Sequence, residues 1–262
     1  MMIAIVTLAI GDRYLEIYSR LFRASQEAYA KRHGYEFKVI TEYLDDDLMH
    51  KDLVSFQKAL VFSQPWSYDY DILIFIDADI YIRADSPPIH TVADFTEKIG
   101  IVNEFAQPTK ELRLAMQARC GWETSATDYY KLCGFHLETD VAPNSGVMIA
   151  RPAIHGEYLR KIYETYKETA IHHPRGYIYE QTVIGYCLVR DAKYVCIPNE
   201  WNGLWMINKI IYHEKELPAF IGETYFTHLA GSFQFDKLYD FLCAQSTPVS
   251  NPAHNRNGEG IV

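Results

Sequence analysis

The sequence predicts an α/β fold: a single domain in which helices flank a mostly parallel central sheet. The first observation is that the apolar runs at 2–8 and 72–76 are short and uninterrupted, as in strands buried on both faces. The second is that segments with helical spacing separate the strand patterns, so the first hundred residues alternate between strand and helix. No stretch has the composition of a linker, and 262 residues suit one large domain.

The first part of the chain supplies three strands and two helices. Its predicted elements are, in order, a strand at 2–8, a helix at 14–29, a strand at 35–40, a helix at 53–63 and a strand at 72–76. The first helix has a clear end, because the basic turn Lys31-Arg32-His33 precedes Gly34, and glycine readily adopts the left-handed conformation found at helix ends.

The rest of the chain is less regular. Its predicted elements are a strand at 146–150, helices at 154–170 and 179–189, strands at 193–197 and 224–228, and a helix at 233–243. Residues 104–143 and the aromatic loop 201–205 show no clear periodicity. Because the chain is poor in apolar residues after residue 245, we expect 246–262 to be a flexible tail.

Composition argues against several classes of function. The net charge is −9 and no run of basic residues occurs, whereas a nucleic-acid site needs clustered Lys and Arg. The five cysteines form no Cys-x-x-Cys pair, which favours reduced thiols and a cytoplasmic location. No apolar run reaches the roughly 18 residues of a membrane-spanning helix. The oligomeric state is left open.

Two acids follow one of the most hydrophobic segments of the chain, in "YDILIFIDADIY" (Tyr70–Tyr81). Asp77 stands where the strand 72–76 ends, and ligand sites of parallel α/β sheets lie at such carboxyl ends. In an extended chain, Asp77 and Asp79 point to the same side. Two carboxylates in one space suit a hard divalent cation, which often also binds phosphate. The alternative is that both acids are ordinary strand-end or turn residues.

The segment "ILIFIDADIYI" resembles the Asp-x-Asp strand end of GT-A fold glycosyltransferases. Further segments are similar to the galactosyl-, xylosyl- and glucosyltransferase families of this fold, in the same order: "SFQKALVFSQPW" (55–66), "PNSGVMIARP" (143–152), "YEQTVIGYCL" (179–188) and "FTHLAGS" (226–232). The resemblance covers most of residues 2–232. It implies transfer of a sugar from a nucleotide-diphosphate sugar, UDP-sugar favoured, to a hydroxyl acceptor such as a glycan.

The resemblance also implies a metal site made by Asp77, Asp79 and His228. Mn²⁺ is the expected cofactor and Mg²⁺ an alternative, because imidazole suits Mn²⁺ better. Without the resemblance, His228 would be one of ten histidines and a structural role would be the simpler interpretation.

A nucleotide site is implied around the first strand. Its expected residues are Thr7, Leu8, Ala9, Tyr14, Lys58 and Asp77. The backbone of 7–9 would face the base, the Tyr14 ring would stack on it, Lys58 would reach the diphosphate and Asp77 would lie near the ribose. The alternatives are that Tyr14 belongs to a buried helix face and that Lys58 is a solvated helix lysine.

The donor sugar is expected to contact Asn144, Ser145, Gly146, Glu180 and Gln181. The resemblance implies that Gln181 lies close to the anomeric carbon and that Glu180 hydrogen-bonds the sugar, so Gln181 and Glu180 are the first catalytic candidates. Simple alternatives are that Asn144 is a turn residue and that Glu180 and Gln181 are first-turn helix residues.

These segments favour a retaining reaction. An inverting enzyme needs a general base near the acceptor hydroxyl, and we expect it to be Asp140, with Asp128 and Glu138 as alternatives in the same irregular segment. A Lys or Trp often follows His-x-x-Gly in the related families. Here Ser232 and Phe233 follow instead, which leaves the diphosphate clamp open.

One domain over 1–245 is therefore expected, with a nucleotide-binding half at 1–103 and a donor-sugar and acceptor half at 104–245. Sugars stack on aromatic rings, so the acceptor site is expected among a set of aromatic residues of which most belong to the core: Trp122, Tyr129, Tyr130, Trp201 and Trp205. Two alternative functions remain: a nucleotidyltransferase that makes sugar nucleotides, and a non-catalytic sugar- or nucleotide-binding module.

Overall fold

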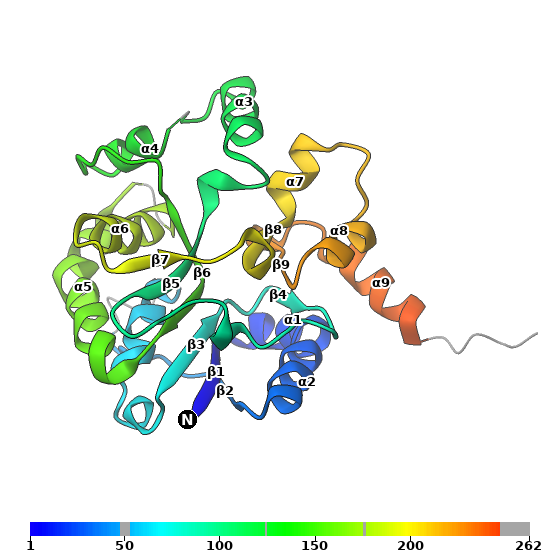
Figure 1. The fold of residues 1–262 in the computed structure, drawn as a ribbon, viewed down its shortest axis with the longest axis horizontal. Helices are drawn as coiled ribbons and strands as arrows, with labels where there is room; N and C mark the ends of the chain where they lie inside the picture. The colour runs from blue at the N-terminus through cyan, green and yellow to red at the C-terminus, as the bar shows by residue number, and fades with distance from the viewer. Residues whose placement is uncertain (48–52, 124, 175–176, 247–262) are drawn as a thin grey trace, which may run out of the picture.

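The computed structural model of the protein describes residues 1–47, 53–123, 125–174 and 177–246. A six-stranded sheet forms its centre (Figure 1). Its strands, in spatial order, are β2 (Glu36–Ile40), β1 (Ile3–Leu8), β3 (Ile72–Ile76), β6 (Pro143–Ala150), β5 (Ile99–Asn103) and β7 (Tyr194–Cys196). A smaller sheet contains β4 (Ile80–Ile82), β9 (Phe226–His228) and β8 (Gly203–Leu204).

The central sheet is mostly parallel, as predicted. The strand β1 pairs in parallel with β2 and β3, and β5 pairs in parallel with β7. Only β6 runs in the opposite direction, antiparallel to both β3 and β5. Because Ile76 pairs with Val147, the beginning of β6 lies beside the end of β3. Residues 143–146 therefore share an edge of the sheet with Asp77.

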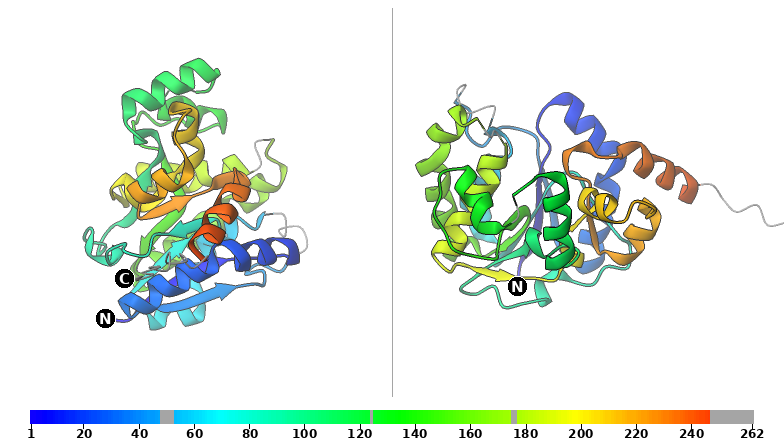
Figure 2. Two further views of the ribbon diagram at one scale, coloured as in Figure 1. Left: turned by 90° about the vertical axis from the view of Figure 1, so that its right-hand side faces the viewer. Right: turned by 90° about the horizontal axis from the view of Figure 1, so that it is seen from above.

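Helices cover both faces of this sheet (Figure 2). The α-helices of the described residues are α1 (Asp12–Leu21), α2 (Arg23–His33), α3 (Lys110–Cys120), α4 (Ala126–Leu132), α5 (Pro152–His172), α6 (Tyr177–Arg190), α7 (Trp205–Ile211), α8 (Leu217–Glu223) and α9 (Phe235–Ser246). Short 3₁₀ helices are η2 (Phe56–Ser63), η3 (Pro65–Asp69), η4 (Ile89–Thr91), η5 (Glu104–Ala106), η6 (Asn199–Asn202) and η7 (Ala230–Ser232).

Alternate residues of the central strands enter two separate cores. Val6 and Phe75 pack with η2, α5 and α6 on one face, whereas Ile5 and Ile74 pack with α2, β4 and β9 on the other. This two-sided burial explains why β1 and β3 are continuous apolar runs rather than alternating ones. A third core lies between α1, α7, α8 and α9 and includes Trp205.

The small sheet joins the end of the chain to the acid pair. The strand β4 begins three residues after Asp77, and it pairs antiparallel with β9 so that Ile80 lies opposite His228. On its other side β9 pairs with β8, where Leu204 lies opposite His228. Two segments far from the acids in sequence are thereby fixed beside them.

Several local predictions are wrong. The predicted helix at 14–29 is two helices that meet at Phe22, and the predicted helix at 53–63 is mainly the 3₁₀ helix η2. The segment 104–143, expected to be irregular, contains α3 and α4, and the loop 201–205 contains β8. Gly34 ends α2 with φ 68°, as expected. Of the predicted tail 246–262, Ser246 closes α9 and the remainder lies outside the described residues.

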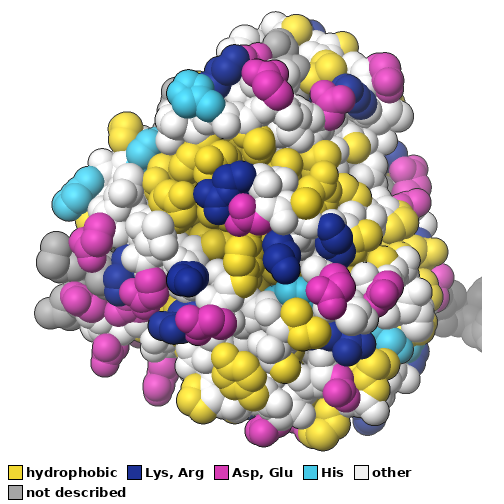
Figure 3. Space-filling view, turned by 60° about the vertical axis from the view of Figure 1, so that its left-hand side comes forward, with side chains coloured by type: hydrophobic (Ala, Val, Ile, Leu, Met, Phe, Trp, Pro, Cys, Tyr) yellow, Lys and Arg dark blue, Asp and Glu magenta, His cyan; other side chains and the backbone are white. Residues whose placement is uncertain are grey.

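In the described part of the chain, no helix has both the length and the apolar character needed to cross a membrane. Figure 3 shows one face of the molecule, on which basic side chains lie singly among acidic ones and hydrophobic side chains gather between them.

Candidate functional site

The acid pair lies in a tight turn at the end of β3. The Asp77 amide donates to the Gly146 carbonyl (2.8 Å), and the Ile80 amide donates back to the Asp77 carbonyl (3.2 Å). The backbone is thus folded at Ala78 and Asp79, not extended as the sequence argument assumed. The two carboxylates nevertheless face the same space, because the turn brings the Asp79 side chain round to meet Asp77.

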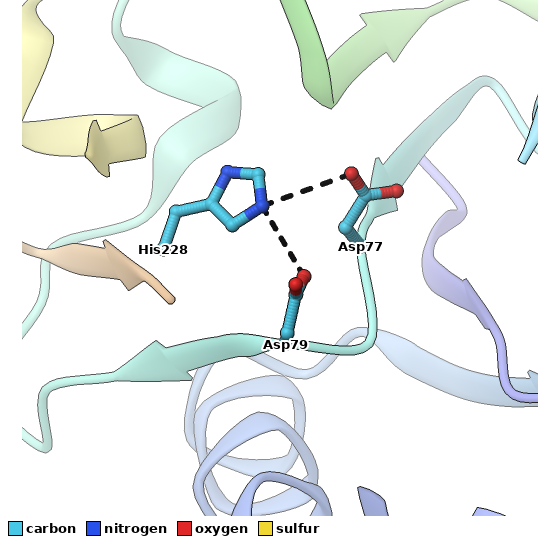
Figure 4. Close-up of side chains that lie close together, drawn as sticks. All are labelled: Asp77, Asp79 and His228. Atoms are coloured by element: carbon cyan, nitrogen blue, oxygen red, sulfur yellow. Dashed lines mark ion pairs between the residues drawn. The ribbon is translucent and has the colours of Figure 1, made fainter. Parts of the chain in front are cut away.

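His228 completes a cluster of three possible metal ligands (Figure 4). Its Nε2 lies 3.2 Å from Asp79 Oδ1 and 3.9 Å from Asp77 Oδ2. Neighbouring ligands around an octahedral ion with bonds near 2.1 Å are about 3 Å apart, so this spacing suits one divalent cation with two carboxylate oxygens and an imidazole nitrogen. Within the described residues, the three predicted metal ligands therefore converge.

Without a cation, the cluster is held as an ion pair. Burial opposes both charges, yet the Asp79 carboxylate raises the pKa of His228 and the His228 ring lowers the pKa of Asp79. A divalent cation would replace the proton on Nε2.

Lys58 is a buried partner of the acids rather than a solvated lysine. It lies in η2, and its Nζ contacts Asp77 Oδ1 at 2.8 Å, Ser145 Oγ at 3.3 Å and Glu180 Oε1 at 3.8 Å. Burial disfavours the ammonium, but Asp77 and Glu180 outweigh it and raise the pKa of Lys58. The charge of Lys58 is thereby kept beside the predicted diphosphate position.

Glu180 is a buried carboxyl group in the first turn of α6. Burial, only partly offset by Lys58, raises the pKa of Glu180 to about 7. Its Oε2 has no hydrogen-bond partner among the described residues. An unpaired buried polar atom costs free energy, so Oε2 is available to a polar group that enters the site.

The predicted donor-sugar residues of β6 are buried beside the metal cluster. Asn144 is a strand residue rather than a turn residue, and its Oδ1 accepts from the Gly146 amide (2.9 Å). A Cβ atom at Gly146 would lie 2.5 Å from Cε1 and 2.8 Å from Nδ1 of His228. Glycine is therefore required at 146 for the imidazole to reach the acids.

Three residues that the sequence analysis did not select complete the site: Glu104, Arg113 and Asn202. Glu104 Oε2 accepts from Asn144 (3.0 Å) and Gln181 (2.9 Å), and its Oε1 accepts from the buried Arg113 (2.6 Å). Burial opposes the Glu104 charge, but Arg113 and these amides hold the pKa of Glu104 below its usual value. Asn202 links Asn144 to His228. The sequence signal for Glu104 is that it directly follows the apolar strand β5, which the sequence analysis did not predict.

The predicted base-binding segment ends β1. Thr7 is fully buried and its hydroxyl has no partner within the described residues. The Leu8 backbone pairs with β2, and the Ala9 amide donates to Ile40, so this amide is already used. Tyr14 is 38% exposed, which argues against a wholly buried helix face. The Tyr14 ring lines a small cavity together with Ala78 and Asp79, and partial burial and the charges of Asp79 and Asp77 raise the pKa of Tyr14.

The three candidate bases for an inverting reaction lie outside this buried network. Asp140 is exposed and pairs with Lys110 (2.6 Å), Asp128 accepts at the start of α4 from Ser125, and Glu138 is exposed. Of the aromatic candidates, Tyr130, Trp201 and Trp205 are buried, Tyr129 is partly buried beside Gln181, and Trp122 is 41% exposed.

Solved glycosyltransferases share this architecture. A glycosyltransferase involved in the glycosylation of the major capsid of PBCV-1 has a TM-score of 0.56 at 16% identity, over 92% of this chain and 99% of that chain. The galactosyltransferase LgtC, solved with donor and acceptor sugar analogs, has a TM-score of 0.54 at 13% identity, over 92% and 96%. The chain has the GT-A fold.

The bifunctional glycosyltransferase WbbM has a TM-score of 0.58 at 12% identity, over 94% of this chain and 50% of that chain. No family model matches the sequence, and no curated protein does. The comparisons therefore establish the GT-A architecture, and the metal cluster of this chain lies at the end of β3 within it.

Proposed function

We propose that the chain is a metal-dependent glycosyltransferase that moves a sugar from a nucleotide-diphosphate sugar to a hydroxyl acceptor. The observation that carries the proposal is the convergence of Asp77, Asp79 and His228 at the sheet edge of a GT-A fold. A UDP-sugar is the favoured donor, a glycan the favoured acceptor and Mn²⁺ the favoured ion.

The leaving-group side of the reaction needs positive charge. A bound divalent cation would neutralise the charge that develops on the diphosphate. Lys58 holds a second positive charge next to Asp77, in a buried place where its effect is not screened by water. The ring of Tyr14 and the end of β1 remain the proposed base site.

The donor sugar is proposed to lie over the start of β6. There, Ser145 and Asn144 present polar groups, and Glu180 Oε2 is unpaired. With its raised pKa, Glu180 can donate or accept a hydrogen bond near neutral pH. Gln181 is the proposed residue nearest the anomeric carbon, and this set favours retention; inversion with Asp140 as base is the alternative.

The test is thermal stability with UDP, GDP, CDP and dTDP, each with and without Mn²⁺. We expect one diphosphate to stabilise the protein only with the ion, by about 2.7 kcal/mol at 100 times its dissociation constant. Asp79→Ala should abolish the effect, whereas the exposed Asp94→Ala should not. If no diphosphate stabilises the wild type, the proposal is wrong.

Turnover separates the proposal from its alternatives. A glycosyltransferase releases UDP from a UDP-sugar in the presence of an acceptor, a nucleotidyltransferase releases pyrophosphate from a nucleoside triphosphate, and a binding module does neither. The anomeric configuration of the product, read by NMR, distinguishes retention from inversion.

A further inference from the structure

A continuous path of hydrogen bonds connects the His228 ring to Glu104. His228 Nδ1 lies 2.9 Å from Asn202 Oδ1, and Asn202 Nδ2 donates to Asn144 Oδ1 at 2.7 Å. Asn144 Nδ2 in turn donates to Glu104 Oε2 at 3.0 Å. His228 and Asn144 are almost fully buried, and Asn202 is wholly so, which means that water does not compete for these groups.

The direction of every bond in this path is set at Asn144, where the Glu104 carboxylate and the Gly146 backbone amide act together. An ionised carboxylate only accepts hydrogen bonds, so Asn144 must turn its NH₂ group toward Glu104. Its carbonyl oxygen then faces Asn202 and also accepts from the Gly146 amide (2.9 Å). Asn202 must therefore donate to Asn144 and turn its own oxygen toward His228.

The orientation of Asn202 determines which nitrogen of the His228 ring carries a hydrogen. Because Asn202 Oδ1 can only accept, the nitrogen that faces it, His228 Nδ1, must carry a hydrogen. In a neutral imidazole the lone pair is then on Nε2, the atom that faces Asp77 and Asp79. The hydrogen bond made by one ring nitrogen decides which nitrogen can bind a metal.

We propose that Glu104 is a positioning residue that sets, together with the Gly146 amide and through Asn144 and Asn202, the tautomer in which His228 offers Nε2 to a divalent cation. The inference rests on the metal site of the proposed function. It adds a residue 124 positions away from His228, on a different strand end, which touches neither the ion nor its ligands.

Because Arg113 donates to Glu104, one substitution at 104 should reverse the direction of the hydrogen bonds in this path. In Glu104→Gln, the buried guanidinium, which only donates, would hold the new carbonyl oxygen that replaces Glu104 Oε1 (2.6 Å). The new NH₂ group would then face Asn144 and Gln181 and favour reversal of these two amides and of Asn202, at the loss of the bond from the Gly146 amide. A reversed Asn202 would present a donor to His228 Nδ1. The favoured tautomer would become the one that cannot bind a cation through Nε2.

A second substitution should restore the site. In Glu104→Gln with Asn202→Asp, the carboxylate at 202 accepts from the reversed Asn144 and also from the hydrogen on His228 Nδ1. The Nε2 lone pair is thereby recovered although Glu104 is absent. A merely structural role of Glu104 predicts the opposite, because the double variant then carries two defects instead of one.

The experiment measures the dissociation constant of Mn²⁺, from the EPR signal of the free ion, with and without UDP. We expect Glu104→Gln to weaken binding by roughly tenfold or more, and the double variant to return to within about threefold of wild type. Nitrogen NMR of the Mg²⁺-saturated protein, with His228 assigned by its loss in His228→Asn, should show hydrogen on Nδ1 in wild type and double variant only.

The outcomes are distinct. Unchanged Mn²⁺ affinity and an unchanged tautomer in Glu104→Gln would overturn the inference and leave the proposed function standing. A wild type that binds no Mn²⁺ in either condition would overturn both. If Glu104→Gln does not fold, Asn202→Leu replaces it, since removal of the acceptor beside Nδ1 should cause the same loss of affinity and of tautomer preference; normal values there would refute the inference.

Discussion

Burial of the Glu180 carboxyl makes its ionisation unfavourable, so the stability of the folded protein should depend on pH. The pKa of this carboxyl is about 7 in the folded protein, above its unfolded value. The folded state therefore binds more protons between about pH 4.5 and pH 7, so ionisation of Glu180 lowers stability as pH rises through this window.

The variant Glu180→Gln lacks this titration and should be more stable than wild type at pH 8 by on the order of 2–3 kcal/mol. At pH 4 the two proteins should be about equally stable in this respect, because the wild-type carboxyl is then protonated. Urea unfolding in EDTA at several pH values measures the difference, and parallel pH profiles would contradict the assignment.

Gly146 is constrained by its contact with the His228 ring. In Gly146→Ala, the new methyl group would lie within 3 Å of two ring atoms, so the ring must move away from the acids. We expect a loss of stability of about 1–3 kcal/mol and a loss of Mn²⁺ binding, measured by calorimetry.

The matched control is Gly100→Ala on β5. Its Cβ would lie 2.4 Å from the Phe95 ring, a similar overlap in the same sheet but against a core side chain. This variant should lose stability and keep its affinity for Mn²⁺. Equal affinity in both variants would show that the ring does not need Gly146.

At the scale of elements, Lys58 is placed by the packing of α5 against η2. Gly156 of α5 lies so close to η2 that a Cβ atom would be 2.3 Å from the Phe62 carbonyl oxygen. A backbone atom cannot move as easily as a side-chain end, so this contact fixes how near the two helices lie.

Substitution of glycine by alanine within a helix is ordinarily stabilising by up to about 1 kcal/mol. We expect the reverse for Gly156→Ala, a destabilisation of about 1–3 kcal/mol, because overlap with η2 outweighs propensity. Gly222→Ala in α8 is the control, since no atom lies within 4 Å of its Cβ position. Chemical denaturation compares the two, and a stabilised Gly156→Ala would refute the packing argument.

The sequence predicts those elements and ligands whose signal is local. The apolar runs of β1 and β3 identify buried strands, and the short motifs identify the metal cluster that the structure assembles. Glu104 and Asn202 could not be found in this way, because their roles depend on η5, η6, β6 and β9 lying together in the fold. The failure at 53–63 has a different cause: helical periodicity does not distinguish an α-helix from the tighter η2.

At the scale of the whole molecule, the two proposed halves are not separate units. The strand β6 of the second half lies between β3 and β5 of the first, and β7 pairs with β5. Unfolding of residues 1–103 alone would break both edges of β6. We therefore expect one cooperative transition.

This expectation is tested by heating with two probes, circular dichroism for helices and tryptophan fluorescence for the core around Trp201 and Trp205. Both should give one coincident midpoint, and saturating Mn²⁺ should raise that midpoint without splitting the transition, because the ligands come from both halves. Two separate midpoints would show that the halves fold independently.

The pairing of Asn103 with Pro143 has a consequence for how a protein with the proposed function can diversify. The end of β5 and the start of β6 are neighbours in the sheet, so the segment that connects them begins and ends at one place beside the site. Loops that are closed at their base can change length at little entropic cost. If 105–141 holds the acceptor as proposed, new acceptor preferences can arise by insertion there, while the strands that carry the proposed metal ligands keep their register.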